Sequence, residues 1–290
     1  MLPGGDRDPT PSSGLTYSRS MSWLRAWKVF YERRIAVPVD DDGLVLDVGS
    51  GDKPSWRADV LLDRYTGAEH AAQRSGRRRA AVRRPLFDAD AADMPFADGV
   101  FAYAICSNVL EHVTDPAGVA RELSRVAGAG YIEVPEAASA KIVDFPSHLW
   151  WCRLAEEPEG PTLVFTAKSA PYHDPEIAGY IERAGVRREL DAVLNSRFEH
   201  RVIRYHWTGT VRLRVEGELD PAFVERAMQE EGHRRTWETV LVQGLTFVLT
   251  APARRRRGRP ELLYDDLVKP ELRRGTRQRL RKQIYRPGGQ

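Results

Sequence analysis

The chain has 290 residues, of which 42% are hydrophobic and 29% are charged, a composition that predicts a globular protein of one large domain or two smaller ones. No apolar run reaches the roughly 18–20 residues of a membrane span, and the 2 cysteines, far apart in the sequence, exclude a disulfide scaffold and favour a reducing cytoplasm. The net charge of +3 is unevenly distributed, because basic residues gather between Arg77 and Arg84 and again between Arg254 and Arg286.

The N-terminal part of the chain predicts a leader followed by a helix. Residues 1–19 are rich in proline, glycine and serine, and we expect them to form a disordered leader. Residues 20–36 place most of their apolar side chains on one helical face, which predicts an amphipathic helix at the edge of the core.

The next stretch has the pattern of a nucleoside-binding site. An apolar run, 44–48, predicts a buried parallel strand that ends in the turn Gly49-Ser50-Gly51. A second apolar run, 58–62, ends at Asp63. A glycine turn lets backbone approach a ligand closely, and a carboxylate at the end of the following strand can accept hydrogen bonds from ribose hydroxyls.

The middle of the chain alternates between strand and helix patterns. Short strands are expected at 81–87, 100–106 and 131–134, and a helix is expected at 117–126. Asp115 is the expected N-cap of the helix, and Gly128 and Gly130 are expected to form the turn after it. This alternation predicts an α/β fold, with a parallel sheet covered by helices on both faces.

The pattern is looser beyond residue 136. Apolar periodicity bounded by glycine or proline predicts a strand at 162–166, a helix at 174–184, a hairpin of 198–207 with 211–215, a helix at 221–231 and a strand at 240–249.

Four sequence elements in a fixed order carry a resemblance to a known family. They are Asp47–Gly51, Asp90–Phe96 (DAADMPF), Glu111–Val113 (EHV) and Asp115-Pro116. Over about residues 43–136 the chain resembles the class I S-adenosylmethionine-dependent methyltransferases, in particular the methyltransferase-11-like branch. The resemblance implies a Rossmann-like, seven-stranded, mostly parallel sheet within a domain of residues 20–253, in which residues 141–231 form an insert, or lid, on the acceptor side.

The resemblance also implies which residues bind S-adenosylmethionine. The expected contacts are Asp47, Gly49, Ser50 and Gly51 around the methionine part, Asp63 at the ribose, Asp90, Ala91 and Met94 at the adenine, and Ser107 in the methyl-donor pocket. The chain departs from the family pattern at Ala102, where an aspartate is expected, and in the turn before the fifth strand, which lacks the usual proline. Neither departure removes an expected cofactor contact.

Histidines are the candidate general bases for an acceptor hydroxyl, because imidazole suits proton transfer at neutral pH. The candidates are His112, His148 and His173. The alternative interpretation is that His112 braces its helix and that His148 belongs to an ordinary core cluster with Trp150. The 7 histidines show no paired metal-ligand spacing, so the sequence predicts no metal site.

The sequence therefore predicts a cytoplasmic methyltransferase that acts on oxygen of a small-molecule, sugar or lipid-linked acceptor. One alternative is a non-catalytic protein that keeps the fold and the cofactor. Another is an RNA methyltransferase that uses the basic C-terminal tail, 254–290. We expect this tail to be a solvated extension, and attraction to an anionic surface or to nucleic acid remains open.

Overall fold

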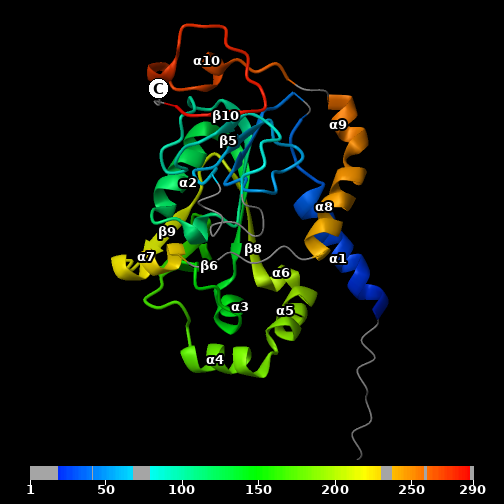
Figure 1. Cartoon of the computed structure of the whole chain (residues 1–290), viewed down its shortest axis with the longest axis vertical. Coiled ribbons are helices and arrows are strands. Elements are labelled where there is room, and N and C mark those ends of the chain that lie inside the picture. The colour runs from blue at the N-terminus through cyan, green and yellow to red at the C-terminus, as the bar shows by residue number, and fades with distance from the viewer. Residues whose placement is uncertain (1–18, 41, 68–78, 230–236, 258–259, 288–290) are drawn as a thin grey trace, which may run out of the picture.

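The computed structural model describes residues 19–40, 42–67, 79–229, 237–257 and 260–287. A seven-stranded sheet with the order β10-β3-β2-β1-β4-β5-β8 lies at its centre (Figure 1). Its strands are β1 Val45–Val48, β2 Val60–Leu62, β3 Leu86–Phe87, β4 Phe101–Ser107, β5 Ala127–Pro135, β8 Val202–Thr208 and β10 Ile284–Tyr285. Every pair is parallel except β5 with β8. The predicted seven-stranded, mostly parallel sheet is confirmed.

Strand β1 is apolar throughout because both of its faces are covered. Leu46 and Val48 point into the main core, whereas Val45 packs on the opposite face with Tyr103 and Tyr131. Alternate residues of one strand thus serve two cores, as the pleat of a strand requires.

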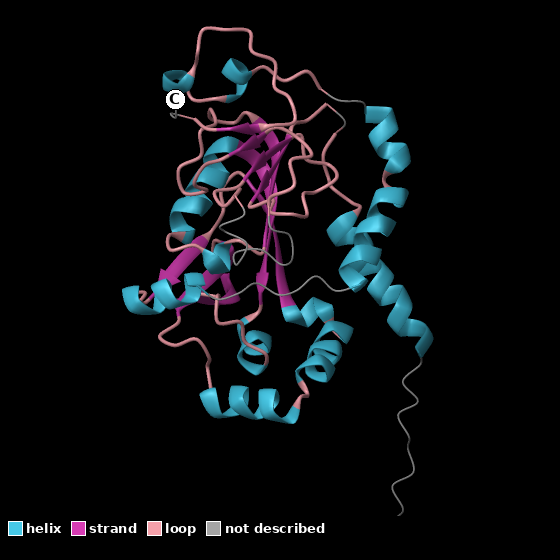
Figure 2. Cartoon of the chain, viewed as in Figure 1, coloured by secondary structure: helices cyan, strands magenta, loops and turns pink. Residues whose placement is uncertain are grey.

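Helices lie on both sides of this sheet (Figure 2). Helix α2, Pro116–Val126, is capped by Asp115, whose carboxylate accepts from the backbone N–H of Gly118, as predicted. Figure 1 shows α2 on one side of the sheet, with α8, Trp237–Leu249, and α9, Ala251–Arg257, on the other. Helix α1, Arg19–Arg34, lies where the sequence predicts a helix over residues 20–36.

A second sheet of three strands is built from the region after β5. It contains β6 Trp150–Glu157, β7 Gly160–Ala167 and β9 Leu213–Glu216. The helices around it are α3 Ala137–Ile142, α4 Pro175–Ala184, α5 Arg187–Ser196, α6 Phe198–Arg201 and α7 Pro221–Gln229. Trp150 and Phe165 of the small sheet share the main core with Trp207 of β8. The predicted helices at 174–184 and 221–231 are confirmed within a few residues.

The predicted turn at Gly128 and Gly130 is wrong, because both glycines lie inside β5. Gly130 pairs across the sheet with Trp207. A Cβ at Gly130 would lie 2.6 Å from the Trp207 ring and would also meet the carbonyl oxygen of Ala104. The glycine is therefore needed for close strand packing and does not mark a turn.

One predicted strand pairing and one predicted strand are also wrong. Residues 198–207 and 211–215 form no hairpin, since β8 pairs with β5 in the main sheet and β9 pairs with β7 in the small one. Residues 240–249, predicted as a strand, belong to α8. A short apolar run does not by itself distinguish a strand from a helix. Because β8 belongs to the main sheet, the range 141–231 is not purely a lid.

The basic C-terminal segment is not the solvated extension that the sequence predicts. Tyr285 of β10 pairs with the sheet edge and stacks on Phe87, with ring centroids 5.4 Å apart. Short elements α10, Tyr264–Leu267, and η3, Pro270–Leu272, precede β10 and add buried side chains to the core. The many arginines hide this apolar pattern in the sequence.

Some predicted features fall outside the described residues, namely the leader apart from Arg19 and the basic residues Arg77 and Arg78. No helix in the described ranges is both long enough and apolar enough to cross a membrane.

Candidate cofactor and acceptor site

The strand order places a ligand crevice at one point of the sheet. The chain winds outward in opposite directions from β1 and β4, which are neighbours. In open α/β sheets, ligands bind at such a switch point, outside the carboxyl ends of the strands. The segments that follow β1, β2 and β4 begin with Gly49, Asp63 and Asn108. The structure thus brings these three segments to one edge.

The turn after β1 needs glycine for conformation and for space. Gly49 and Gly51 have φ values of 65° and 50°, in the left-handed region that favours glycine. A Cβ at Gly49 would collide with the side chain of Val109. At Gly51 the nearest atom to such a Cβ would be the Gly49 carbonyl oxygen, 3.9 Å away. The Gly51 side of the turn is therefore open to a ligand.

Asp63 ties the ends of β1 and β2 together. One carboxylate oxygen accepts from the backbone N–H of Gly51 at 2.7 Å and the other from Tyr65 at 2.8 Å. Asp47 is buried too, and its carboxylate accepts from the backbone N–H of Ser55 at 2.7 Å. Burial raises the pKa of Asp47 to about 7. These carboxyl groups hold the loop in shape before any ligand is bound.

Two polar atoms beside the turn fit a polar ligand. The Ser50 hydroxyl and one carboxylate oxygen of Asp52 are buried, and neither has a hydrogen-bond partner among the described residues. Buried polar atoms without a partner cost stability, and ligand-binding sites are a common reason for them. The sequence analysis missed Asp52, although its place directly after the glycine turn was a usable signal.

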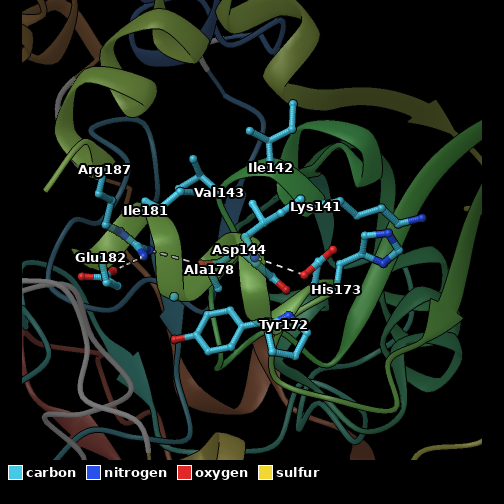
Figure 3. A pocket seen from close by; sticks show the side chains of 14 residues that line it. Lys141, Ile142, Val143, Asp144, Tyr172, His173, Ala178, Ile181, Glu182 and Arg187 are labelled. Atoms are coloured by element: carbon cyan, nitrogen blue, oxygen red, sulfur yellow. Dashed lines mark hydrogen bonds and ion pairs between the residues drawn. The ribbon is translucent and has the colours of Figure 1, made fainter. Parts of the chain in front are cut away.

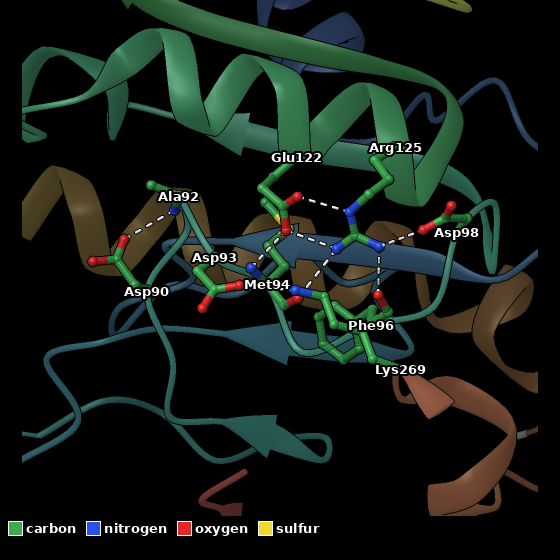
Figure 4. Close-up of polar contacts among 9 residues, drawn as sticks. All are labelled: Asp90, Ala92, Asp93, Met94, Phe96, Asp98, Glu122, Arg125 and Lys269. Carbon is green, nitrogen blue, oxygen red and sulfur yellow. Dashed lines mark hydrogen bonds and ion pairs between the residues drawn. The ribbon is translucent and has the colours of Figure 1, made fainter. Parts of the chain in front are cut away.

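The expected adenine-binding residues have different surroundings. Asp90 is half-exposed, and its carboxylate accepts from Ala92 N–H at 2.9 Å (Figure 4). The same carboxylate pairs with Arg64 at 2.6 Å. Ala91 is nearly buried. Met94 is 0% exposed and packs in the main core. Its side chain presents no surface to solvent in this structure, and the expected contact with the adenine stays a prediction.

The turn that carries Asp90 is fixed from helix α2. The Arg125 guanidinium donates to the carbonyl oxygens of Phe96, at 2.7 Å, and Met94, at 3.1 Å. It also pairs with Glu122, which accepts from the Met94 N–H, and with Asp98 (Figure 4). The sequence element that resembles the family therefore owes its shape to a helix about 30 residues later in the chain.

The end of β4 is joined to α1 through a buried glutamate. Glu133 accepts from the Arg33 guanidinium and from the Tyr131 hydroxyl. It also accepts from the Ser107 hydroxyl and from the Asn108 side chain, each at 3.2 Å. Although burial raises the pKa of Glu133, the Arg33 hydrogen bonds and charge lower it to about 2.

Asn108 is a second residue that the sequence analysis missed. It has a φ of 55°, in the left-handed region that residues other than glycine rarely adopt. Such backbone strain gathers at functional sites. Ser107, an expected cofactor contact, is its neighbour at the same edge.

Glu111, His112 and His148 meet beside the end of β4. Their ligand-type atoms lie within 4.8 Å of one another, and the two imidazole rings are 4.8 Å apart in an edge-to-face arrangement. His112 Nδ1 lies 3.0 Å from the carbonyl oxygen of Ser147. Burial raises the pKa of Glu111 to about 8 and lowers that of His112. The structure thus brings together His112 and His148, two of the candidate bases, with Glu111, which belongs to the EHV element of the resemblance and was given no role.

The spacing of this cluster favours proton transfer over metal binding. A tetrahedral zinc site, with ligand distances of about 2.0–2.2 Å, places its ligand atoms about 3.3–3.5 Å apart. The ligand-type atoms of Glu111, His112 and His148 lie within 4.8 Å of one another, a looser grouping than a closed tetrahedral site. A neutral imidazole next to the crevice has the chemistry of a general base.

A pocket of about 260 Å³ lies next to the chain segment that leads to His148 (Figure 3). Lys141, Asp144, Tyr172, His173 and Arg187 are among its lining residues. Behind it, the buried Lys168 ammonium pairs with Asp144 at 3.0 Å. The third candidate histidine, His173, therefore lines this pocket and is not part of the cluster.

Comparison with known proteins gives one family match and several solved structures with partial similarity. Residues 46–131 match the family described as a methyltransferase domain. No curated protein matches the chain. A S-adenosylmethionine-dependent methyltransferase of Thermotoga maritima is 15% identical over 41% of this chain and 59% of that chain, with a TM-score of 0.28.

Other solved structures have a similar degree of likeness. The PH0226 protein of Pyrococcus horikoshii is 15% identical over 71% of this chain and 80% of that chain, with a TM-score of 0.31. A protein of Bacillus halodurans described as a methyltransferase is 16% identical over 55% and 67%, with a TM-score of 0.31. The chain spans 45%, 59% and 62% of the lengths of three matched proteins.

The family match falls on the segment that builds the glycine turn, the Asp90 turn and the end of β4. Over this segment, which is less than a third of the chain, the sequence is similar to methyltransferase domains. This similarity implies S-adenosylmethionine as the cofactor.

Proposed function

We propose that the protein transfers a methyl group from S-adenosylmethionine to an oxygen atom of a small-molecule, sugar or lipid-linked acceptor. The observation that carries this proposal is the half-buried pair His112 and His148, whose rings meet beside the end of β4. A hydroxyl acceptor must lose its proton on methylation. His112 can take this proton, because it lies in the short helical turn that directly follows β4.

The residues of the crevice fit the cofactor. The Asp63 carboxylate, which accepts from Gly51 and Tyr65, is the group that we assign to the ribose hydroxyls. The unpartnered carboxylate oxygen of Asp52 can accept from the amino group of the methionine part, and the Ser50 hydroxyl can donate to its carboxylate. When bound, S-adenosylmethionine supplies a methyl group that its sulfonium has already activated.

His112 is ready to accept a proton. Its Nδ1 faces the Ser147 carbonyl oxygen, which can only accept, so Nδ1 carries the ring proton. Nε2 then has the free lone pair. Because burial lowers its pKa, His112 stays neutral at pH 7. Glu111, with a pKa of about 8, is protonated there and leaves the imidazole as the base.

The pocket of Figure 3 suits the acceptor. Its volume of about 260 Å³ is enough for a sugar ring or a similar small group, and it is lined by both apolar and charged side chains. Lys141 and Arg187 provide hydrogen-bond donors, and Glu182 provides an acceptor. Such a mixture favours a polar, hydroxyl-bearing acceptor with an apolar part.

The test uses methyl-labelled S-adenosylmethionine with fractionated cell extracts. We expect label to enter a polar or lipid fraction with the wild-type protein. The variant His112→Gln should bind the cofactor as before but transfer roughly 10²–10⁴-fold less label, the range lost with a general base. His200→Gln changes an exposed histidine and is the matched control. Product mass spectrometry then locates the methyl group.

The outcomes separate the alternatives. Cofactor binding without labelled product in any fraction would contradict the proposal and favour a non-catalytic protein. Label in an RNA fraction would favour an RNA methyltransferase. Because β10 is part of the sheet, that alternative is tested by substituting Arg255 and Arg256, since deletion of the tail would remove a strand.

A further inference from the structure

Helix α8 presents an apolar stripe to solvent. Its large apolar side chains Leu241, Leu245 and Val248 are 70%, 43% and 66% exposed. They follow one another at spacings of four and three residues, so they lie on one helical face. Leu249, which is 39% exposed, borders this stripe, and Phe247, which is 58% exposed, adds apolar surface on a neighbouring face of the helix. Solvated surfaces rarely keep such a contiguous apolar area without a partner.

A group of arginines follows the stripe directly in α9. Arg254 lies 4.0 Å from the centre of the Phe247 ring and donates to the Phe247 carbonyl oxygen at 2.6 Å. Burial, and then repulsion from Arg83 and Arg255, lowers the pKa of Arg254. Among the described residues, no carboxylate forms an ion pair with Arg254, Arg255 or Arg256. The positive charge next to the apolar stripe is therefore not neutralised within the described part of the chain.

We propose that α8 and α9 bind the surface of an anionic lipid bilayer. The apolar stripe enters the boundary between head groups and acyl chains, and the arginines contact lipid phosphates. Helix α8 has 13 residues, about 20 Å at 1.5 Å per residue, which is too short for a hydrocarbon core of about 30 Å. A helix of this kind lies in the plane of the membrane surface.

The shape of the molecule permits this contact. Figure 1 shows α8 and α9 along one flank, away from α4 at the lower end of the view, and residues of α4 line the pocket. The negatively charged phosphates of a bilayer surface can pair with the arginines. A purely apolar protein surface would bury the same arginines without a partner, which costs free energy. Charge complementarity therefore selects the anionic bilayer over another apolar surface.

The experiment is flotation of the full-length protein with lipid vesicles. We expect binding to vesicles of mixed phosphatidylcholine and phosphatidylglycerol, weaker binding as salt rises, and little binding to phosphatidylcholine alone. The variant Arg255→Ala with Arg256→Ala should bind roughly 30-fold more weakly, since each cation near the surface contributes about fivefold. Leu241→Glu with Val248→Glu should bind at least as weakly.

A matched control shows that the effect belongs to this face. Val193→Glu changes a residue of α5 that is 65% exposed, and it should leave vesicle binding unchanged. Melting temperatures of all variants should stay close to that of the wild type, because the substituted side chains are exposed. Equal binding by wild type and stripe variants would overturn the proposal, as would no binding to anionic vesicles. A dimer without vesicles that the glutamate variants dissociate would overturn it in favour of a second copy.

Discussion

The cofactor edge and the acceptor side of this molecule differ in how their polar groups are held. At the cofactor edge, the Asp63 and Asp47 carboxylates already accept backbone hydrogen bonds, and the loop that they hold spans a short stretch of sequence. On the acceptor side, Glu111 keeps a buried carboxylate oxygen without a partner, and the cluster joins segments 36 residues apart. The loop of the first region already has its shape before a ligand binds. In the second region, the buried Glu111 carboxyl group has a raised pKa, and such shifted pKa values are common at catalytic sites.

The two buried glutamates near β4 should make stability depend on pH in opposite senses. Glu111 has a folded pKa of about 8 against an ordinary 4.5, so its contribution is fully present below pH 4.5 and is lost as pH rises towards 8. The loss corresponds to about 5 kcal/mol. Urea unfolding of wild type and Glu111→Gln from pH 5 to 8 should show the variant gaining relative stability as pH rises.

Glu133 is the matched case with the opposite sign. Its pKa falls from 4.5 to about 2, so its contribution is present above pH 4.5 and is lost as pH falls towards 2, by about 3 kcal/mol. The difference in stability between wild type and Glu133→Gln should shrink on acidification. Parallel pH curves for either variant and the wild type would contradict the assigned ionisation states.

Lys168 tests whether the acceptor side depends on its buried ion pair. The Lys168 ammonium and the Asp144 carboxylate are 0% and 4% exposed and 3.0 Å apart. Lys168→Met leaves a buried carboxylate unpaired and should cost about 3–5 kcal/mol in urea unfolding. Adding Asp144→Leu should restore part of the loss.

Lys28→Met is the control for Lys168, because it removes an exposed ion pair with Glu32 of 3.7 Å. Its cost should stay below about 1 kcal/mol. If both lysine variants had the same stability, the buried pair would not be what holds the segment between Asp144 and His148.

The comparison also explains what the sequence could predict. The conformation of the glycine turn could be predicted because Gly49, Gly51 and Asp63 lie close together in the chain and each has a local conformational reason. The acceptor side was not, since the meeting of His112 with His148 depends on how the segment before β6 folds back. Residue type alone suggested these histidines, and no local pattern showed that they touch.

Other errors arose where long-range packing overrides local pattern. Gly130 resembles a turn residue but makes room for Trp207. Residues 284–285 form a sheet strand, although arginines dominate the segment before them. Helix α8 has the composition of a strand, and its exposed stripe shows only in three dimensions.

Asp63→Ala tests the cofactor edge. The substitution removes the carboxylate that holds Gly51 and that we assign to the ribose, so affinity for S-adenosylmethionine should fall roughly 10–150-fold, the range for hydrogen bonds to a charged group. Isothermal titration calorimetry measures it. Asp98→Ala, which removes an 82% exposed carboxylate from the Arg125 network, should leave affinity within about twofold. Unchanged affinity in Asp63→Ala would remove the ribose assignment.

The smallest expected effect separates binding from stability at the same edge. The Ser50 hydroxyl is buried and without a partner among the described residues, so Ser50→Ala should leave the melting temperature of the free protein unchanged or slightly higher. If the hydroxyl bonds the methionine part of the cofactor, affinity should fall about fivefold, which corresponds to about 1 kcal/mol for one hydrogen bond. A lower melting temperature with unchanged affinity would show that Ser50 is structural. The preorganised loop would then bind through its backbone and Asp63 alone.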